Sequence, residues 1–287
     1  MKVTNYFYRY ATEEHSDRVA IPELLREDYM NPQYFELFSK ELSEISLEGA
    51  VGIIYSSGAS IHQAENRICL KENYTNSLKS ALPSPLVAKS MVSHMMHKYI
   101  NYFTRNGIDI QAADIVSNTC ASSLYGVVKA AEMLAQVDHV IVITEEKTSF
   151  DTIRIFDEHR IKVKASDGFA LAVFSNEGAG PEISNCKTSF TYNRNPFLAT
   201  SEGYKKVYTP CDTVKVHGTG TEMNTLAEEE AFAGHRLVEY KSKIGHSQGS
   251  SGLLELCMAI DDGSICEDVL CVASGFGGFY ASCLLHK

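Results

Sequence analysis

Short runs of branched and other apolar residues alternate along this chain with segments that have helical spacing. Six of the runs predict strands, and they lie at residues 51–57, 108–117, 139–144, 169–174, 213–217 and 269–274. Helices are predicted before or between them, at 33–45, 85–103 and 121–136. Because alternating strands and helices must bury their apolar faces on one another, this order predicts a layered α/β fold.

A cluster of turn-forming residues at 176–181, with the sequence NEGAGP, follows the predicted strand 169–174. This cluster is the best candidate for a boundary between two parts of the chain. We therefore predict an N-terminal part of residues 1–178 and a C-terminal part of residues 179–287. With 287 residues, of which 44% are hydrophobic, the chain can bury a substantial core without disulfides.

Charge and cysteine usage limit the classes of function. A formal net charge of −10 argues against a large nucleic-acid-binding surface, which would need clustered Lys and Arg. The eight cysteines are scattered, include no CxxC pair and fit a reducing compartment, so we expect a cytoplasmic protein. No apolar run approaches the roughly 20 residues needed to span a bilayer, and the start lacks the core of a secretory signal, so no membrane association is expected.

One local run of basic residues could still receive an acidic protein partner. Its members are Arg154, Arg160, Lys162 and Lys164. The alternative is a solvated face of mixed charge, because Asp157 and Glu158 interrupt the run.

Cys120 stands between a predicted strand and a predicted helix, in the sequence DIVSNTCASSLYGVVKAAEML. Its neighbours Ala121, Ser122 and Ser123 are small and permit close approach. A thiol at a helix N-terminus feels the positive end of the helix dipole, which favours the thiolate, and the unpaired amides there can hold an anion. The segment is a candidate nucleophile site, although a cysteine that only packs in a core has the same sequence signature.

Two histidines lie in glycine-rich frames. His217 ends a short predicted strand in VKVHGTGTEMNTLAEEEAF, where the hydroxyls of Thr219 and Thr221 can bond to an extended substrate. His246 lies in YKSKIGHSQGSSGLLELCMAI, again before an apolar helix. A third segment, CVASGFGGFYASCLL, surrounds Phe276 with glycines, which indicates tight backbone at a ligand site. Each segment alone is also compatible with an ordinary turn.

Together and in this order, these segments resemble the elongating β-ketoacyl synthases of the thiolase superfamily. The resemblance is carried by NTCASS around Cys120, HGTGT at His217, KSKIGHSQGSSG at His246 and GFGG at Phe276. Weaker similarities are VGIIYSSGAS, ahead of the cysteine, and SDGFALAVF, which matches the strand that closes the family's first half. The resemblance implies a five-layer αβαβα thiolase fold of two similar halves, the first carrying the nucleophile and the second carrying both histidines.

Decarboxylative Claisen condensation is the chemistry that this resemblance implies. It makes Cys120 the acyl-accepting nucleophile, and His217 and His246 the pair that stabilises the enolate of a malonyl-type extender. Backbone amides of Cys120 and Phe276 would form a second oxyanion hole. Phe276 would also be the gating phenylalanine at the substrate, with Gly277 beside it.

Further positions match the family around these three side chains. Lys241 and Glu255 would form a mutually satisfied buried pair that orders the site. Thr219 and Thr221 would hold a phosphopantetheine arm. No tightly bound cofactor is implied, because the substrate arrives on the phosphopantetheine of an acyl carrier protein or on coenzyme A.

The chain also departs from the family. Glu222 and Thr225 replace the usual Pro and Asp after HGTGT, so the loop that supports His217 is expected to differ. The chain is shorter than a typical elongating synthase, and missing insertions would thin the cap over the acyl tunnel and part of the dimer surface. A homodimer, or a heterodimer with another ketosynthase-like subunit, is therefore expected, acting in specialised polyketide or fatty-acid-like biosynthesis.

Three alternatives remain open. A thiolase-fold acyltransferase or thiolase could use Cys271 as acid and base, although packing in a strand is the commoner role of such a cysteine. A non-catalytic partner of another ketosynthase is favoured by the short chain and opposed by the retained Cys120. A metal site at His94 and His97, three apart on a predicted helix, has no further ligand nearby in the sequence, so no metal is expected.

Overall fold

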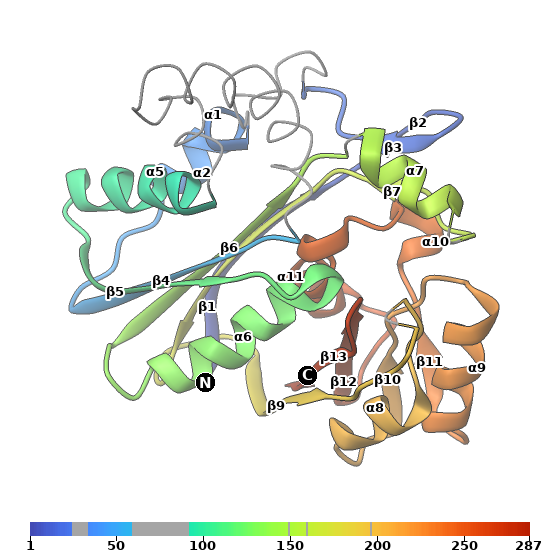
Figure 1. Cartoon of the computed structure of the whole chain (residues 1–287). Coiled ribbons are helices and arrows are strands. Elements are labelled where there is room, and N and C mark those ends of the chain that lie inside the picture. Colours follow the sequence, from blue (N-terminus) through green and yellow to red (C-terminus); the bar gives the residue numbers. More distant parts are fainter. Residues whose placement is uncertain (25–33, 59–91, 149, 159, 196) are drawn as a thin grey trace.

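A ten-stranded sheet runs through the molecule (Figure 1). The computed structural model describes residues 1–24, 34–58, 92–148, 150–158, 160–195 and 197–287. Along the sheet, the strands follow the order β11 (Arg236–Val238), β10 (Thr213–Lys215), β12 (Val269–Gly275), β13 (Phe279–His286), β9 (Glu182–Phe190), β1 (Lys2–Tyr10), β8 (Gly168–Ser175), β6 (His139–Glu146), β4 (Ala50–Ser56) and β5 (Asp109–Val116). A smaller sheet contains β2 (Glu13–Glu14), β3 (Arg18–Ala20) and β7 (Ala165–Ser166).

The order of the strands is repeated on the two sides of the large sheet. One side holds β1, β4, β5, β6 and β8, and the other holds β9 to β13. On both sides, the strand that comes third in the chain lies at the outer edge, followed inward by the second, fourth, fifth and first. The outer three strands are parallel and the inner pairings are antiparallel on each side. The two groups meet where Lys2 of β1 pairs with Glu182 of β9.

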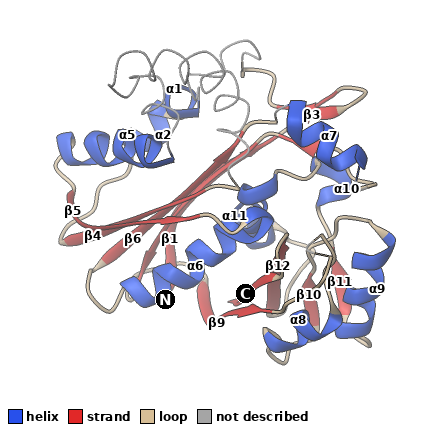
Figure 2. Cartoon of the chain, in the orientation of Figure 1, coloured by secondary structure: helices blue, strands red, loops and turns tan. Residues whose placement is uncertain are grey.

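Two helices lie between the groups of strands, and others cover the outer faces (Figures 1 and 2). The inner helices, α6 (Ser122–Met133) and α11 (Ser251–Asp261), contact each other and strands of both groups. Outside β4 and β5 lie α1 (Tyr34–Leu37), α2 (Ser39–Ser43) and α5 (Val92–Arg105), and on the far side of β9 to β13 lie α8 (Ser201–Lys206) and α9 (Glu222–Ala231). Near the small sheet are α7 (Phe150–Glu158) and α10 (Lys241–Ile244).

Three apolar cores result from this arrangement. The largest surrounds α6 and α11 and includes Leu124 and Leu253. A second packs Phe103 of α5 against β4, β6 and β8, and a third packs Tyr204 and Phe232 against β10 and β12. Since β6 and β8 have cores on both of their faces, they are buried along nearly their whole length and each contains an apolar run, which made them recognisable in the sequence.

The six predicted strands are all confirmed, with ends that differ slightly from the prediction. The predicted helix at 121–136 is confirmed as α6, while the single helix at 33–45 is wrong, because the chain forms the two short helices α1 and α2 there. Of the predicted helix 85–103, residues 92–103 belong to α5 and residues 85–91 lie outside the described part. The boundary predicted after residue 178 falls in the loop between β8 and β9, and the two-domain division stays a prediction. No helix among the described residues is both long enough and apolar enough to cross a membrane.

Candidate active site

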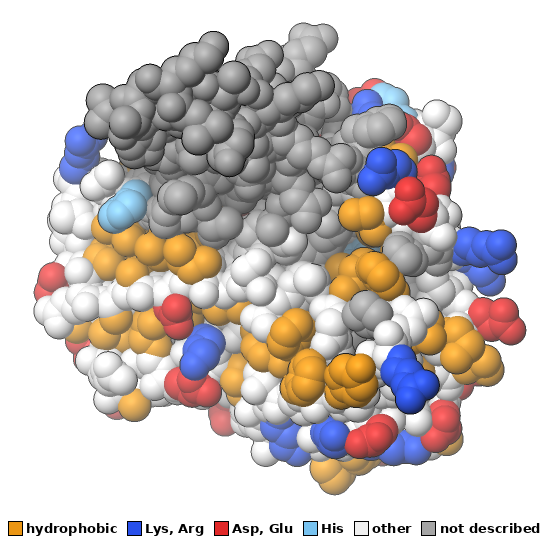
Figure 3. Space-filling model, in the orientation of Figure 1, with side chains coloured by type: hydrophobic (Ala, Val, Ile, Leu, Met, Phe, Trp, Pro, Cys, Tyr) orange, Lys and Arg blue, Asp and Glu red, His pale blue; other side chains and the backbone are white. Residues whose placement is uncertain are grey.

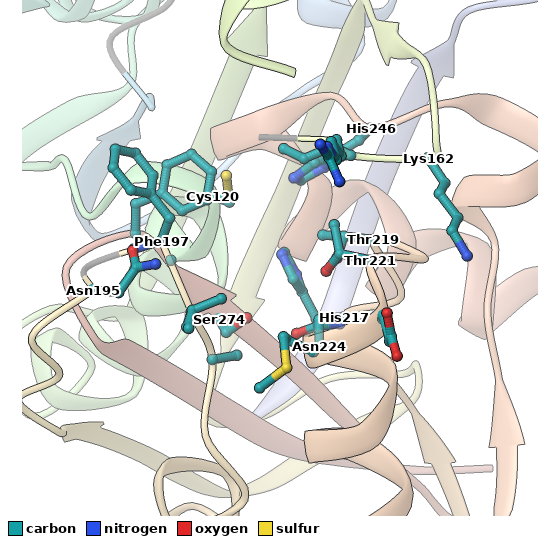
Figure 4. A pocket seen from close by; sticks show the side chains of 18 of the residues that line it. Cys120, Lys162, Asn195, Phe197, His217, Thr219, Thr221, Asn224, His246 and Ser274 are labelled. Atoms are coloured by element: carbon teal, nitrogen blue, oxygen red, sulfur yellow. The ribbon is translucent and has the colours of Figure 1, made fainter. Parts of the chain in front are cut away.

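Three side chains from distant parts of the chain meet in the interior. The sulfur of Cys120 and one ring nitrogen each of His217 and His246 all lie within 4.8 Å of one another, and all three residues are buried. The two imidazole rings are 5.1 Å apart between centroids and almost perpendicular, at 85°. In Figure 4 the sulfur and both rings border the same space. The convergence expected from three separate sequence motifs is therefore present.

Cys120 lies in a tight 3-10 turn, Thr119–Ala121, between β5 and α6. Thr119 has a φ of +52°, a left-handed conformation that a β-branched residue rarely adopts, so the surrounding contacts must hold the turn in place. One of these contacts is the bond that the Thr119 hydroxyl donates to the carbonyl oxygen of Phe276, at 3.2 Å. Another is Gly275, where an added Cβ would lie 2.4 Å from the carbonyl oxygen of Asn118. The C-terminal hairpin thus supports the turn that carries the thiol.

Burial controls the protonation of this thiol. Loss of solvent raises the pKa of Cys120 to about 12, the Lys241 ammonium opposes that rise, and the Glu146 carboxylate adds to it. The helix terminus was expected to favour the thiolate, but the cost of burying a negative charge is larger here. The expected thiolate is therefore not the resting form, and a base is needed when the sulfur attacks.

Both imidazoles are positioned to serve as that base, or as hydrogen-bond donors. Burial is the main cause that lowers the pKa of His217 and of His246 well below 6.5, and the nearby lysine charges lower both further. The rings are consequently neutral at neutral pH. His246 uses Nδ1 to contact the Ser251 hydroxyl at 2.9 Å, which leaves Nε2 for a substrate. Nδ1 of His217 is buried without a hydrogen-bond partner among the described atoms.

The loop after β10 is held by a residue that the sequence analysis missed. Glu228 of α9 accepts a hydrogen bond from the backbone N–H of Gly218 at 2.9 Å. The Tyr204 hydroxyl donates to Asn224, 2.8 Å away, and lies 2.9 Å from the Ser274 hydroxyl and 3.2 Å from Glu228. This network occupies the region where Pro and Asp of the resembled family are replaced, so the loop at His217 has its own support. No feature of the sequence alone would have singled out a glutamate among three consecutive ones.

Lys241 and Glu255 lie behind the histidines, and their expected contact is present. The Lys241 ammonium is 2.6 Å from Oε1 of Glu255, and both side chains are only 1% exposed. Lys241 also donates to the backbone carbonyl of His217 at 2.5 Å. A second lysine, Lys215, lies 2.6 Å from the other carboxylate oxygen, Oε2, and was not predicted. In the sequence, Lys215 is a charged residue among the apolar residues of a predicted strand, which indicates a buried charge, but it belongs to none of the four motifs.

A cavity of about 400 Å³ opens at Cys120, His217 and His246. Thr219, Thr221 and Phe276 line it, and the two threonine hydroxyls are 3.2 Å apart. The Phe276 ring meets that of Phe197 at 4.9 Å, which adds an aromatic contact from the loop after β9. Gly277 is not among the lining residues, and its expected contact with substrate stays a prediction. Its φ of +94° instead makes the turn that presents Phe276.

Two of the four basic residues at 154–164 border this cavity. Arg160 and Lys162 line it, and Figure 4 shows Lys162 across the cavity from Cys120. Arg154 instead approaches Glu158 at 3.4 Å, and Lys164 pairs with Glu14 at 2.7 Å. On the right-hand side of the face seen in Figure 3, basic and acidic side chains are interspersed. The run is thus divided between a mixed-charge surface and the wall of the cavity.

Cys120, His217 and His246 also have the spacing of side chains that could bind a metal ion, and they are the one such group of three among the described residues. One thiol and two imidazoles can surround a zinc-like ion with a fourth position open. The pair considered from the sequence, His94 and His97, cannot be assessed, because the side chain of His94 lies outside the described residues.

Solved structures provide the comparison with known proteins. A β-ketoacyl synthase from Burkholderia phymatum STM815 matches with a TM-score of 0.71 and 16% sequence identity, over 100% of this chain and 92% of that one. The ishigamide ketosynthase/chain length factor matches with a TM-score of 0.68 and 16% identity, over 98% and 91%. The AntDE:AntF complex of a type II polyketide synthase carrier protein with its ketosynthase matches with a TM-score of 0.65 and 14% identity, over 98% and 92%. Neither a family model nor a curated protein matches the sequence.

These matches extend over nearly the whole chain, and they share the strand and helix arrangement described above. The chain therefore has the mixed α/β, thiolase-like fold of the β-ketoacyl synthases.

Proposed function

We propose that the protein is a β-ketoacyl synthase that joins an acyl group to a malonyl-type extender by decarboxylative Claisen condensation. The observation that carries this proposal is the convergence of Cys120 with two neutral imidazoles at one cavity. Such a site offers one nucleophile and two hydrogen-bond donors within reach of the same substrate carbonyl. Acid chemistry with charged imidazoles is disfavoured, because burial keeps both rings unprotonated.

In the first half-reaction, the acyl group moves from a carrier thioester to Cys120. The Cys120 sulfur bonds to the acyl carbon, the bond to the carrier sulfur breaks, and the thiol proton ends on the departing carrier thiol. Because burial favours the protonated thiol, a neutral imidazole near Sγ takes this proton during attack and returns it to the leaving sulfur. The amides of Cys120 and Phe276 are proposed to stabilise the negative oxygen.

In the second half-reaction, the extender carboxylate leaves as carbon dioxide and its electron pair enters an enolate. N–H groups of His217 and His246 donate to the enolate oxygen, so negative charge develops against donors that are already in place. The enolate carbon then attacks the acyl carbon on Cys120, and the carbon–sulfur bond breaks. The released thiolate takes one proton from the medium, which returns the enzyme to its starting state.

A carrier-bound substrate accounts for the remainder of the cavity. Thr219 and Thr221 are proposed to bond to the amides of a phosphopantetheine arm, brought by an acyl carrier protein or as coenzyme A. Arg160 and Lys162, which line the cavity with them, suit an acidic carrier and the phosphate of its arm. No resident cofactor or metal is needed for these steps, and none is proposed.

Two similar halves, residues 1–178 and 179–287, stacked as five αβαβα layers, are our proposal for the domain organisation. The repeated strand order supports it. A second repetition supports it too: a 3-10 turn precedes α6 and another precedes α11, and each begins with a left-handed residue, Thr119 at +52° and Gln248 at +47°. In this comparison Gly249 occupies the place of Cys120, so only the first half carries a nucleophile.

Assembly and location are proposed by analogy. Structures with this fold include a ketosynthase/chain length factor and a ketosynthase with its carrier protein. We propose a homodimer or a heterodimer with a related subunit, working in polyketide or fatty-acid-like biosynthesis. A cytoplasmic location is consistent with the seven described cysteines, all of which are free.

The alternatives differ in what they require of the cysteines. Thiolase-type chemistry would need Cys271 at the reaction centre, whereas Cys271 is fully buried in β12, faces Cys283 across the strand pair, and does not line the cavity. Packing is the role that this position favours. A non-catalytic partner subunit would retain the fold without acylation of Cys120.

The test is transfer of a radiolabelled acyl group from acyl carrier protein or coenzyme A, followed by release of labelled carbon dioxide from the malonyl thioester. Wild type is expected to gain label at Cys120, and Cys120→Ala is expected to gain none. The exposed Cys266 offers a matched control, since Cys266→Ala should be labelled like wild type. A folded wild type that neither accepts the acyl group nor releases carbon dioxide would refute the synthase and support the partner subunit.

A further inference from the structure

A second lysine lies behind the two histidines. Lys215 is the last residue of β10, two positions before His217, and it is completely buried. Its strand neighbours Val214 and Val216 belong to the outer core, so alternation along the strand turns Lys215 to the opposite face, toward α11. A lysine this deeply buried needs a partner.

That partner is the carboxylate of Glu255, which two ammonium groups share. Lys215 lies 2.6 Å from Oε2 and Lys241 lies 2.6 Å from Oε1, with all three side chains 1% exposed. One negative charge therefore faces two positive charges. We call these three residues the Lys–Glu–Lys triad.

Neighbouring groups do not form a further ion pair with the triad among the described residues. Glu228 of α9 bonds to the Gly218 amide and the Tyr204 hydroxyl, burial raises its pKa, and its carboxylate is the smallest of the causes that act on the pKa of Lys215 and Lys241. Cys271 of β12 faces Lys215, and Glu146 faces Cys120 from the end of β6. Lys241 thus lowers the pKa of the Cys120 thiol directly, and both lysines lower the pKa of the two imidazoles.

The triad reaches the reacting groups through one bond. Lys241 donates to the backbone carbonyl of His217, so the residue that shares Glu255 with Lys215 also fixes the histidine. After burial, the charges of Lys241 and Lys215 are causes that lower the pKa of both His217 and His246. Lys215 thus has a route to the site that needs no contact with substrate.

We propose that Lys215 is a positioning residue: it supplies the excess positive charge of the Lys–Glu–Lys triad, and through Glu255 and Lys241 it keeps His217 and His246 neutral and favours ionisation of Cys120. This inference rests on the proposed function, because it assigns a role at the same site. It adds a charge that neither the four motifs nor the Lys241–Glu255 pair required.

The test measures the thiol without requiring condensation. Alkylation of Cys120 by iodoacetamide is followed by mass spectrometry from pH 6 to 10 in wild type, Lys215→Met and Lys215→Arg. Methionine has a similar length but no charge, so Cys120 should react about tenfold more slowly at a given pH, which corresponds to about 1.4 kcal/mol. Arginine should restore most of the wild-type rate. Lys205→Met removes a surface lysine that pairs with Glu230 and should change nothing.

Glu255→Gln gives a prediction of opposite sign. The glutamine leaves both lysines without the shared negative charge, so Cys120 should be alkylated faster than in wild type. If the substitutions only damaged packing, alkylation would instead be slower in both Lys215→Met and Glu255→Gln. The imidazole resonances of His217 and His246 should titrate at higher pH in Lys215→Met than in wild type. Wild-type alkylation in folded Lys215→Met, or slowing in both Lys215→Met and Glu255→Gln, would overturn the inference. Failure of acyl transfer in wild type would instead overturn the proposed function, and leaves the alkylation result interpretable.

Discussion

Ser251→Ala tests how one of the two imidazoles is oriented. The Ser251 hydroxyl is 2.9 Å from Nδ1 of His246, and both side chains are almost completely buried. The alanine variant leaves a buried ring nitrogen without a partner, which costs about 1–3 kcal/mol of the free energy of unfolding. If the same energy orients the ring toward the enolate, decarboxylation of the malonyl thioester should slow about 5- to 150-fold.

The neighbouring serine provides the matched control. Ser250 is equally buried, but its hydroxyl donates to the backbone carbonyl of Ser247 at 2.8 Å, whereas Nδ1 of His246 contacts Ser251. Ser250→Ala should lose stability, measured by urea unfolding, while its release of labelled carbon dioxide stays close to that of wild type. A folded Ser251→Ala protein that decarboxylates at the wild-type rate would refute the orienting role of this bond.

Two other predictions concern stability. Gly275→Ala places a Cβ 2.4 Å from the carbonyl oxygen of Asn118, so it should lower the free energy of unfolding in urea by about 1–3 kcal/mol and reduce acylation of Cys120. Gly263→Ala is the control, because its Cβ meets nothing within 4 Å, and it should have neither effect. Burial holds the pKa of His217 and His246 well below 6.5, so unfolding takes up protons as pH falls below that value. The stability that the neutral rings contribute is fully present above pH 6.5. Below pH 6.5 it should fall by up to about 1.4 kcal/mol per pH unit for each ring. This would be contradicted if the difference in free energy of unfolding between wild type and His217→Phe stayed constant from pH 7 to pH 5.

Strands with cores on both faces had the clearest signal in the sequence. β4, β6 and β8 are almost completely buried and contain apolar runs for that reason. β1 and β9 each have one buried position, are otherwise partly or fully exposed, and contain several polar residues, so no strand was assigned to them. β1 and β9 pair with each other and so join the two groups of strands. Local sequence patterns therefore did not predict how the two groups are connected.

The residues of the candidate site were predictable from motifs, and their environment was not. Cys120, His217 and His246 each stand in a short, recognisable frame, and the structure places them together. The protonation of the thiol depends on how much solvent the folded chain removes, which the sequence does not record. Lys215 contacts Glu255, 40 residues away, and Glu228 contacts the amide of Gly218, so these bonds exist only after α11 and α9 have packed against β10 and the loop that follows it.

The support of the Cys120 turn by Gly275 and Phe276 has a consequence for synthesis of the protein. Since the hairpin that steadies the thiol follows it by more than half the chain, a ribosome releases the cysteine long before its supporting wall or either histidine exists. The nascent polypeptide therefore carries an ordinary thiol. The proposed acyl chemistry would require the last two strands to have joined the sheet, so it would depend on completion of folding.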